Sequence, residues 1–321
     1  MNGLVRFTAV ISPIALLGTA IIILIAALPA IRYNGLFFFE HNAWKPGNSY
    51  GNTVVTNGIA HAPGAQFGGV FLIVGTLLAG LIAVLVGVPI SVGAAIFIYK
   101  KLPQKISGLG NFLLEILAGI PSVIFGLWGA LTFGPFLAHD ISPIIANNVP
   151  KIGPLKFLTG NVGAGEGLLA SGIILAIMIV PIVASTTAGL LKQVPEGLRE
   201  GARALGMTDY EILKTVDLRW IKTGLIGSAV LGLGRALGET MAVAMVSGSF
   251  LGAIPNSIYS TMTTIAATIA TQLDSALQDS TGFTISVLAE AGLVLLVINL
   301  VVNVFARIMI SRSNKLQLPA G

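Results

Sequence analysis

The chain has 321 residues, of which 55% are hydrophobic and only 10% are Asp, Glu, Lys or Arg. A soluble globular protein carries about 25% charged residues, so this composition excludes a soluble enzyme. It also excludes a disordered chain, which needs low hydrophobicity and high net charge. Because cysteine is absent, no disulfide, thiolate metal site or cysteine nucleophile exists. The net charge of +5 raises the question of where the lysines and arginines lie relative to a membrane.

Six apolar stretches are each long enough to cross a bilayer as a helix, which takes about 20 residues. They predict an all-α, polytopic membrane helix bundle with six transmembrane helices. Pro89, Pro121 and Pro181 lie inside the second, third and fourth stretches and predict kinks there. The predicted spans cover residues 7–31, 69–98, 111–137, 168–191, 223–250 and 286–310.

Arg6 precedes the first apolar stretch, an arrangement that also occurs in secretory signal peptides. The apolar core of a signal peptide is about 7–15 residues long, and the run over residues 7–31 exceeds that length. We therefore expect this stretch to be retained as a transmembrane helix.

Most of the 18 lysines and arginines would lie on one side of a six-span bundle. The positive-inside rule then places both termini in the cytoplasm. The opposite side carries two long segments, 32–67 and 138–167, whose Gly, Asn and Pro content predicts loops with little regular structure. All three histidines fall in these segments without metal-ligand spacing, so neither a metal site nor a cofactor is expected.

The segment between the fourth and fifth spans, residues 195–219, is predicted to form two short amphipathic helices. Pro195 suits the first turn of a helix, and Gly206 is a natural C-terminal stop. After this glycine, Thr208 or Asp209 can cap a second helix.

One face of the first short helix is predicted to be apolar, because Leu198, Ala202 and Leu205 recur at helical spacing. This face could lie on the membrane surface, or it could dock on a cytoplasmic partner. Periodicity alone favours the membrane surface.

A resemblance to a known loop favours docking. Glu200-Gly201-Ala202, then Gly206 and Val216-Asp217-Leu218, resemble the "EAA" loop of ABC-importer permeases. The resemblance implies that Glu200, Gly201, Ala202 and Gly206 belong to a coupling helix that sits in a cleft of an ATPase subunit. Gly201 replaces the usual middle Ala, and Arg219 stands where Pro is usual. The chain has no Gly-Lys dipeptide and hence no P-loop, so ATP would be hydrolysed by another polypeptide.

Charged residues inside a span cost free energy and are retained when they are paired or face a polar path. Arg235 and Glu239 in the fifth predicted span are four residues apart, so they would share a helix face. They could form an ion pair that locks the bundle, or line an anion path, since guanidinium matches a tetrahedral oxyanion. Two further carboxylates are Glu115 in the third span and Glu290 near the outer end of the sixth. Hydroxyls on the fifth span, which usually bond between helices, are additional candidate donors: Ser228, Thr240 and Ser247.

Three stretches closely resemble PstC-type permeases of bacterial phosphate importers. They are residues 115–129, 232–243 and 264–270. The resemblance implies a type I ABC-importer permease fold in the bacterial inner membrane, and a substrate path that includes Arg235 and Glu239. It also divides the chain into a first transmembrane helix with a long periplasmic loop (1–68), a permease domain with its coupling loop at 195–219 (69–315) and a C-terminal tail (316–321).

The resemblance further implies a permease subunit of an ATP-driven phosphate importer, with no enzymatic activity of its own. Its partners would be a second permease of PstA type, a dimer of PstB-type ATPases, a PstS-type solute-binding protein, inorganic phosphate and membrane lipid, but not nucleic acid. The outer segment 257–273 would either lie at the membrane interface or contact the binding protein.

Three alternatives stay open at this point. One is an ABC permease for sulfate, molybdate or phosphonate, because a single arginine does not separate tetrahedral oxyanions. A second is a stand-alone secondary carrier, which would not need a docking helix. A third is a membrane enzyme, which would need a clustered catalytic set that the sequence does not contain.

Overall fold

The computed structural model describes residues 2–48 and 51–315, so the predicted tail 316–321 lies outside the described residues. The helices are α1 (Asn2–Asn34), α2 (Phe37–Glu40), α3 (Val70–Ile96), α4 (Gln104–Gly119), α5 (Ser122–Trp128), α6 (Gly134–Phe136), α7 (Ser142–Asn148), α8 (Leu168–Lys192), α9 (Glu196–Ala204), α10 (Asp209–Ile212), α11 (Leu218–Leu237), α12 (Met241–Val246), α13 (Ile265–Leu277) and α14 (Phe283–Lys315). Short strands are β1 (Trp44–Lys45), β2 (Val54–Thr56), β3 (Ile59–His61) and β4 (Gln66–Phe67). π-helical turns cover Phe97–Lys101, Gly129–Phe133, Leu137–Ile141 and Leu213–Asp217, and a 3-10 turn covers Gly153–Leu158.

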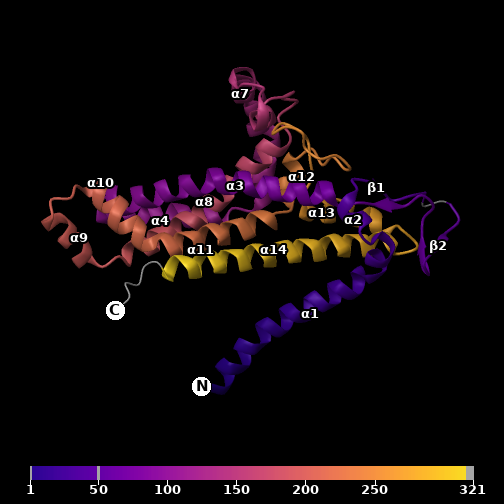
Figure 1. Ribbon diagram of the computed structural model, residues 1–321, viewed down its shortest axis with the longest axis horizontal. Coiled ribbons are helices and arrows are strands. Elements are labelled where there is room, and N and C mark those ends of the chain that lie inside the picture. The colour runs from indigo at the N-terminus through magenta and orange to yellow at the C-terminus, as the bar shows by residue number, and fades with distance from the viewer. Residues whose placement is uncertain (1, 49–50, 316–321) are drawn as a thin grey trace.

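The long helices α3, α8, α11 and α14 run along one common axis, with α9 and α10 at one end and β1 and β2 at the other (Figure 1). α1 diverges from this bundle and meets α14 near the strand end, so that α1 begins and α14 ends on the side of α9. The arrangement confirms the predicted all-α membrane bundle.

α3 and α8 form the centre of the bundle, and glycines let their backbones approach closely. A Cβ on Gly87 of α3 would lie 2.8 Å from Ile179 of α8, and a Cβ on Gly172 would collide with Ile82. Small residues at such crossings are typical of membrane helices, because van der Waals packing drives their association. Around them lies a buried apolar cluster that includes Leu175.

Within the described residues, five helical stretches are long and apolar enough to cross a membrane. Four of them correspond to the first, second, fourth and sixth predicted spans. The five stretches are Pro13–Asn34, Val70–Lys100, Ser122–Asn148, Leu168–Lys192 and Phe283–Ser311.

The third predicted span, 111–137, has the wrong bounds. α4 ends at Gly119, Ile120 is extended, and a new helical stretch runs over Ser122–Asn148. Pro121 explains the break, because proline lacks an N–H and disfavours a helical conformation of the preceding residue. After this proline, α5 still packs against α12 and α8. Further along the chain, α7 projects away from the long helices (Figure 1).

The fifth predicted span, 223–250, is discontinuous. α11 ends before residues 238–240, which are not helical, and the short α12 follows. α11 also carries Arg219, Lys222 and Arg235, so it is more polar than the five apolar stretches. The predicted continuous helix is therefore two helices with a break between them.

The first outer segment, 32–67, is more ordered than its composition predicts. β1 pairs with β4 so that Trp44 faces Phe67, and β2 pairs with β3. Phe67 is fully buried, and its ring lies 5.9 Å from that of Phe283 at the start of α14. Aromatic burial against the bundle thus orders a segment that was expected to be an irregular loop. In the second outer segment, α7 and a 3-10 turn replace the expected loop.

The outer segment 257–273 does not begin as a helix lying on a membrane surface. Tyr259, Met262 and Ala267 are buried, and the N–H of Ile265 at the start of α13 donates a 3.0 Å hydrogen bond to Thr76 Oγ1 of α3. The first half of the segment therefore belongs to the interior of the bundle, and the expectation of an interfacial helix is wrong for this part.

Candidate functional site

Local hydrogen bonds end α9 in the way the sequence predicts. Gly206 has φ +80° and donates a 2.9 Å hydrogen bond to the Arg203 carbonyl. Met207 donates a 3.1 Å bond to the Ala202 carbonyl. This pair of bonds is a Schellman motif, in which glycine adopts the left-handed conformation without steric cost. The prediction that Gly206 stops the first helix is confirmed.

The second short helix is capped by Thr208, one of the two residues predicted to do so. Thr208 Oγ1 accepts a bond from the Glu211 N–H, and Glu211 Oε2 accepts a 2.8 Å bond from the Thr208 N–H. These two bonds form a capping box, and the bond from the Thr208 backbone lowers the pKa of Glu211. Pro195 precedes the first turn of α9 and acts as its N-cap residue.

The apolar face predicted for α9 is only partly turned into the protein. Ala202 is buried, whereas Leu198 is 44% exposed and Leu205 is 82% exposed. Tyr210 of α10 is exposed as well. The α9–α10 segment, residues 196–212, thus presents large apolar side chains outward, together with Glu200 and Gly201.

A buried arginine holds α9 against the bundle. Arg199 Nε donates a 2.8 Å bond to Asp217 Oδ1, and Arg199 Nη1 donates 2.9 Å bonds to Tyr99 Oη and Glu196 Oε2. Its Nη2 bonds the Leu191 carbonyl at the end of α8. Burial disfavours the charge, but the hydrogen bonds to Asp217 and Glu196 outweigh burial and raise the pKa of Arg199. The guanidinium therefore stays charged at the junction of four segments.

Asp217 is the fully buried acceptor of this junction. Its second carboxylate oxygen lies 2.7 Å from Lys100 Nζ, so the carboxylate lies between two cations. No pattern in the sequence predicts a role for Arg199, Lys100 or Asp217. Because these three residues lie far apart in the chain, no periodic pattern links them. Asp217 appears in the sequence argument only as the middle residue of the motif Val216-Asp217-Leu218.

An ion pair on the surface of α9 adds to the junction. Glu196 bonds Arg199 and also Arg203, with Oε1 3.1 Å from Arg203 Nη1. The hydrogen bonds from Arg199 and then from Arg203 lower the pKa of Glu196.

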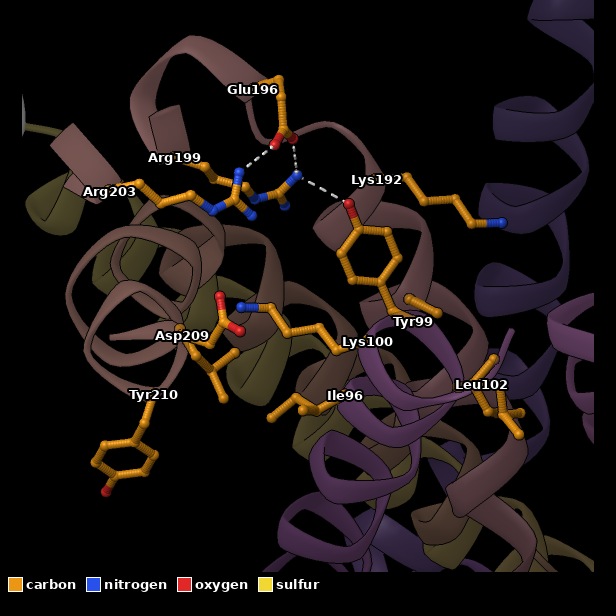
Figure 2. Close-up of a pocket in the computed structure, with 13 residues that line it drawn as sticks. Ile96, Tyr99, Lys100, Leu102, Lys192, Glu196, Arg199, Arg203, Asp209 and Tyr210 are labelled. Carbon is orange, nitrogen blue, oxygen red and sulfur yellow. Dashed lines mark hydrogen bonds and ion pairs between the residues drawn. The ribbon is translucent and has the colours of Figure 1, made fainter. Parts of the chain in front are cut away.

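A cavity of about 730 Å³ lies beside this junction. Figure 2 shows Glu196 bridging Arg199 and Arg203 at its rim, with Tyr99 directed toward Arg199. Its walls come from the ends of α3 and α8 and from the α9–α10 segment, and they include Ile96, Ile98, Lys100, Leu102, Ala188, Lys192, Asp209, Tyr210 and Leu213.

The second predicted site, around Arg235, lies where α11 ends. Arg235 is exposed in the last turn of α11, and it makes no ion pair with any described residue. Glu239 lies in the break beyond that helix, where its Oε1 accepts a bond of 3.5 Å from the Ala242 N–H. The two residues do not share one helix, so the predicted i, i+4 relation does not hold. An ion pair that locks the bundle does not form here.

The three predicted hydroxyl donors lie in different surroundings. Thr240 is in the break next to Glu239, and its hydroxyl donates to the Gly238 carbonyl at 3.2 Å. Ser228 and Ser247 are buried; Ser228 donates to a carbonyl of its own helix, and Ser247 accepts a bond from the Ser249 N–H. The structure therefore brings Thr240, but not the two serines, beside Glu239 in the chain break.

Comparisons with known proteins agree with this architecture. Residues 87–315 match the family described as "Binding-protein-dependent transport system inner membrane component". In the fold, the chain resembles the inward-facing methionine ABC transporter MetNI, with a TM-score of 0.51, 17% identity, and coverage of 76% of this chain and 96% of that chain. A bacterial alginate ABC importer gives the same TM-score and identity over 76% of this chain and 79% of that chain. The chain belongs to this family of transport-system membrane components, and its fold is that of a type I ABC-importer permease.

Its relatives within the family are phosphate transport system permease proteins. PstC 1 of Mycobacterium tuberculosis is 56% identical over 98% of this chain and 93% of the relative. PstC of Haemophilus influenzae is 36% identical over 93% of this chain and 91% of the relative. These relatives confirm the resemblance to PstC-type permeases, and with the apolar helices they make the chain a multi-pass membrane protein that is not itself the ATPase.

Proposed function

We propose that the chain is a transmembrane permease subunit of an ATP-driven phosphate importer, in which it forms part of the translocation path and couples to a separate ATPase. The observation that carries this proposal is the 56% identity to a phosphate transport permease over 98% of the chain. A distant fold likeness alone would leave the transported solute open.

The α9–α10 segment is the proposed ATPase contact, through Glu200, Gly201, Ala202 and Gly206. Its exposed Leu205 supports docking, because large apolar side chains gathered at a surface are typical of interaction sites. α1 begins and α14 ends on the same side as this segment. With the positive-inside rule, this supports a cytoplasmic location for both termini and for α9.

Arg235, Glu239 and Thr240 are the proposed residues of the substrate path. Broken membrane helices expose backbone groups to polar paths, and transporters build binding sites at such breaks. Arg235 is a cation without an ion-pair partner among the described residues, so its planar donors are open to an oxyanion. Ser228 and Ser247 are buried, whereas Thr240 is partly exposed, so the two serines are weaker candidates for the path.

The proposed assembly contains a second permease of PstA type, two PstB-type ATPases and a PstS-type binding protein. α1 and α14 carry many exposed apolar side chains, among them Leu17, Ile22, Leu300 and Phe305. In a membrane these side chains would face lipid or the second permease. The division of the chain at residues 68 and 315 is also part of the proposal, because the family match, residues 87–315, falls within the segment 69–315.

Reconstitution in proteoliposomes tests the proposal. The complete complex should take up radiolabelled phosphate only with ATP and the binding protein, and excess sulfate, molybdate or phosphonate should not compete. Competition by one of those anions would assign the chain to another oxyanion. Uptake without the ATPase would instead support a stand-alone carrier.

A further inference from the structure

The Arg199 junction ties the α9–α10 segment to three separate helices. Tyr99 and Lys100 come from the end of α3, the Leu191 carbonyl from the end of α8, and Asp217 from the residue before α11. Each of these contacts is 2.7–2.9 Å long. α9 is therefore fixed by polar bonds as well as by the burial of Ala202.

Asp217 is the member of the junction that contacts both Arg199 and Lys100. Its side chain is fully buried, whereas that of Arg199 is 7% exposed and that of Lys100 is 21% exposed. A buried ion pair is retained when its charges are matched, and removal of one partner leaves the other charge unpaired in a medium of low polarity. Loss of the carboxylate would leave two cations facing each other at the junction.

The ion pair of Lys100 with Asp217 joins two segments whose backbone conformation is unusual. Lys100 lies in the π-helical turn Phe97–Lys101 at the end of α3, and Asp217 lies in the π-helical turn Leu213–Asp217 before α11. π-helical turns are uncommon and occur frequently at functional sites. Here two of them bring the opposite charges of α3 and α11 together.

α11 connects the junction with the proposed substrate path. The helix begins at Leu218, directly after Asp217, and its last turn contains Arg235. A continuous helix transmits a displacement of one end to the other. A movement of α9 would thus reach the break at residues 238–240 through Asp217 and α11.

We propose that Asp217 is a positioning residue that locks the α9–α10 segment to α3 and α11, so that the three move as one body when the ATPase closes. This inference rests on the proposed coupling to an ATPase. It assigns no contact with phosphate or ATP to Asp217. Without the carboxylate, ATP hydrolysis and the opening of the path become separate events.

The test uses the complete complex with Asp217→Asn, which keeps the shape of the side chain and removes its charge. The expected result is that the ATPase still co-purifies and hydrolyses ATP within twofold of the unchanged complex, while phosphate uptake per ATP falls at least tenfold. Asp274→Asn is the matched control, because Asp274 is exposed on α13, outside the α9–α10 segment, and belongs to no ion pair among the described residues. Unchanged uptake per ATP in Asp217→Asn would overturn the proposal.

A distance measurement separates a lock from a general loss of structure. The chain has no cysteine, so spin labels at Gly197→Cys on α9 and Phe97→Cys in the π-helical turn that follows α3 would be the only two on it. The distance distribution should be narrow with Asp217 and clearly broader with Asp217→Asn. If Asp217→Asn does not assemble, Arg199→Lys, which loses the Nε donor, should broaden the distribution instead. An equally narrow distribution in the variant would refute the lock.

The outcome for Leu205→Glu distinguishes this inference from the proposed function beneath it. If that variant keeps its ATPase, docking through the α9–α10 segment fails, whatever Asp217 does. If the variant loses its ATPase while Asp217→Asn transports normally, docking stands and only the lock is overturned.

Discussion

Asn34 at the end of α1 donates a hydrogen bond of 2.7 Å to Glu290 of α14, and both side chains are buried. The bond lies near the strand end of the molecule, where α1 meets α14. No ion pair to Glu290 exists among the described residues. The carboxyl group therefore depends on an amide from another helix.

Replacement of Glu290 by Ala should weaken the junction of α1 and α14. The variant loses one interhelical bond and leaves the Asn34 amide buried without its acceptor, at a cost of about 1 kcal/mol. In thermal unfolding of the detergent-purified protein, this corresponds to a melting temperature lower by roughly 2 °C. Glu290→Gln keeps an acceptor oxygen and should melt close to the unchanged protein. If Glu290→Ala melts at the same temperature as the unchanged protein, the bond between Asn34 and Glu290 does not contribute to stability.

Sequence alone predicted the features that local chemistry determines. Long apolar runs give spans because lipid cannot satisfy backbone hydrogen bonds, and Gly206 and Thr208 end and begin helices through bonds within a few residues. The ion pair of Arg199 with Asp217 joins residues 18 positions apart, and the contact with Lys100 is more distant still. Nothing in hydrophobic periodicity reports such contacts.

The expected pairing of Arg235 and Glu239 failed for a related reason. It assumed one continuous helix, whereas packing of α12 against α5 competes with continuation of α11 beyond Gly238. Gly126 of α5 lies so close to α12 that an added Cβ would be 2.9 Å from the Ala242 Cα. Tertiary packing of this kind is invisible to a reading of composition and spacing.

Arg235→Ala should abolish most phosphate uptake without loss of the assembled complex. A charge-assisted hydrogen bond to the anion contributes about 1.5–3 kcal/mol, so uptake should fall about 10- to 100-fold. Arg307→Ala is the control, because Arg307 is also exposed on an apolar helix, at a distance along the chain from the break. Normal uptake by Arg235→Ala proteoliposomes would remove this residue from the path.

Leu205→Glu should release the ATPase from the complex. A charge placed in an apolar contact would cost roughly 2 kcal/mol, or about a 30-fold loss of affinity. The ATPase that co-purifies with the tagged permease measures this loss. Leu277→Glu alters another exposed leucine at the end of α13, outside the α9–α10 segment, and should keep the ATPase bound. Retention of the ATPase by Leu205→Glu would contradict docking at α9.

Alanine at two glycines of the α9–α10 segment should have opposite effects. Gly206 has φ +80°, so Gly206→Ala should cost about 1 kcal/mol in backbone strain. Gly201 lies inside α9, where Gly201→Ala should stabilise the helix by about 0.5–1 kcal/mol. An added Cβ meets nothing within 4 Å at either position, so packing does not confuse the comparison. Amide hydrogen exchange in α9 should become faster in Gly206→Ala and slower in Gly201→Ala. A change in the same direction in both variants would show that backbone conformation does not cause the effects.

Asp279 should make the start of α14 sensitive to pH. Partial burial pushes its pKa up, but hydrogen bonds from Thr281 and Thr284 outweigh burial and lower the pKa below its usual value. A carboxylate with a lowered folded-state pKa stabilises the protein above the unfolded-state pKa of about 3.9, and this contribution is lost as pH falls through the folded-state value.

Asp279→Asn should therefore melt about 2–4 °C below the unchanged protein at pH 7. The difference should stay constant down to about pH 4.5 and shrink at lower pH. Asp274→Asn on α13 is the control, because Asp274 is exposed and forms no ion pair among the described residues. A melting difference that grows as the solution becomes more acidic would mean that protonated Asp279, rather than its carboxylate, stabilises the start of α14.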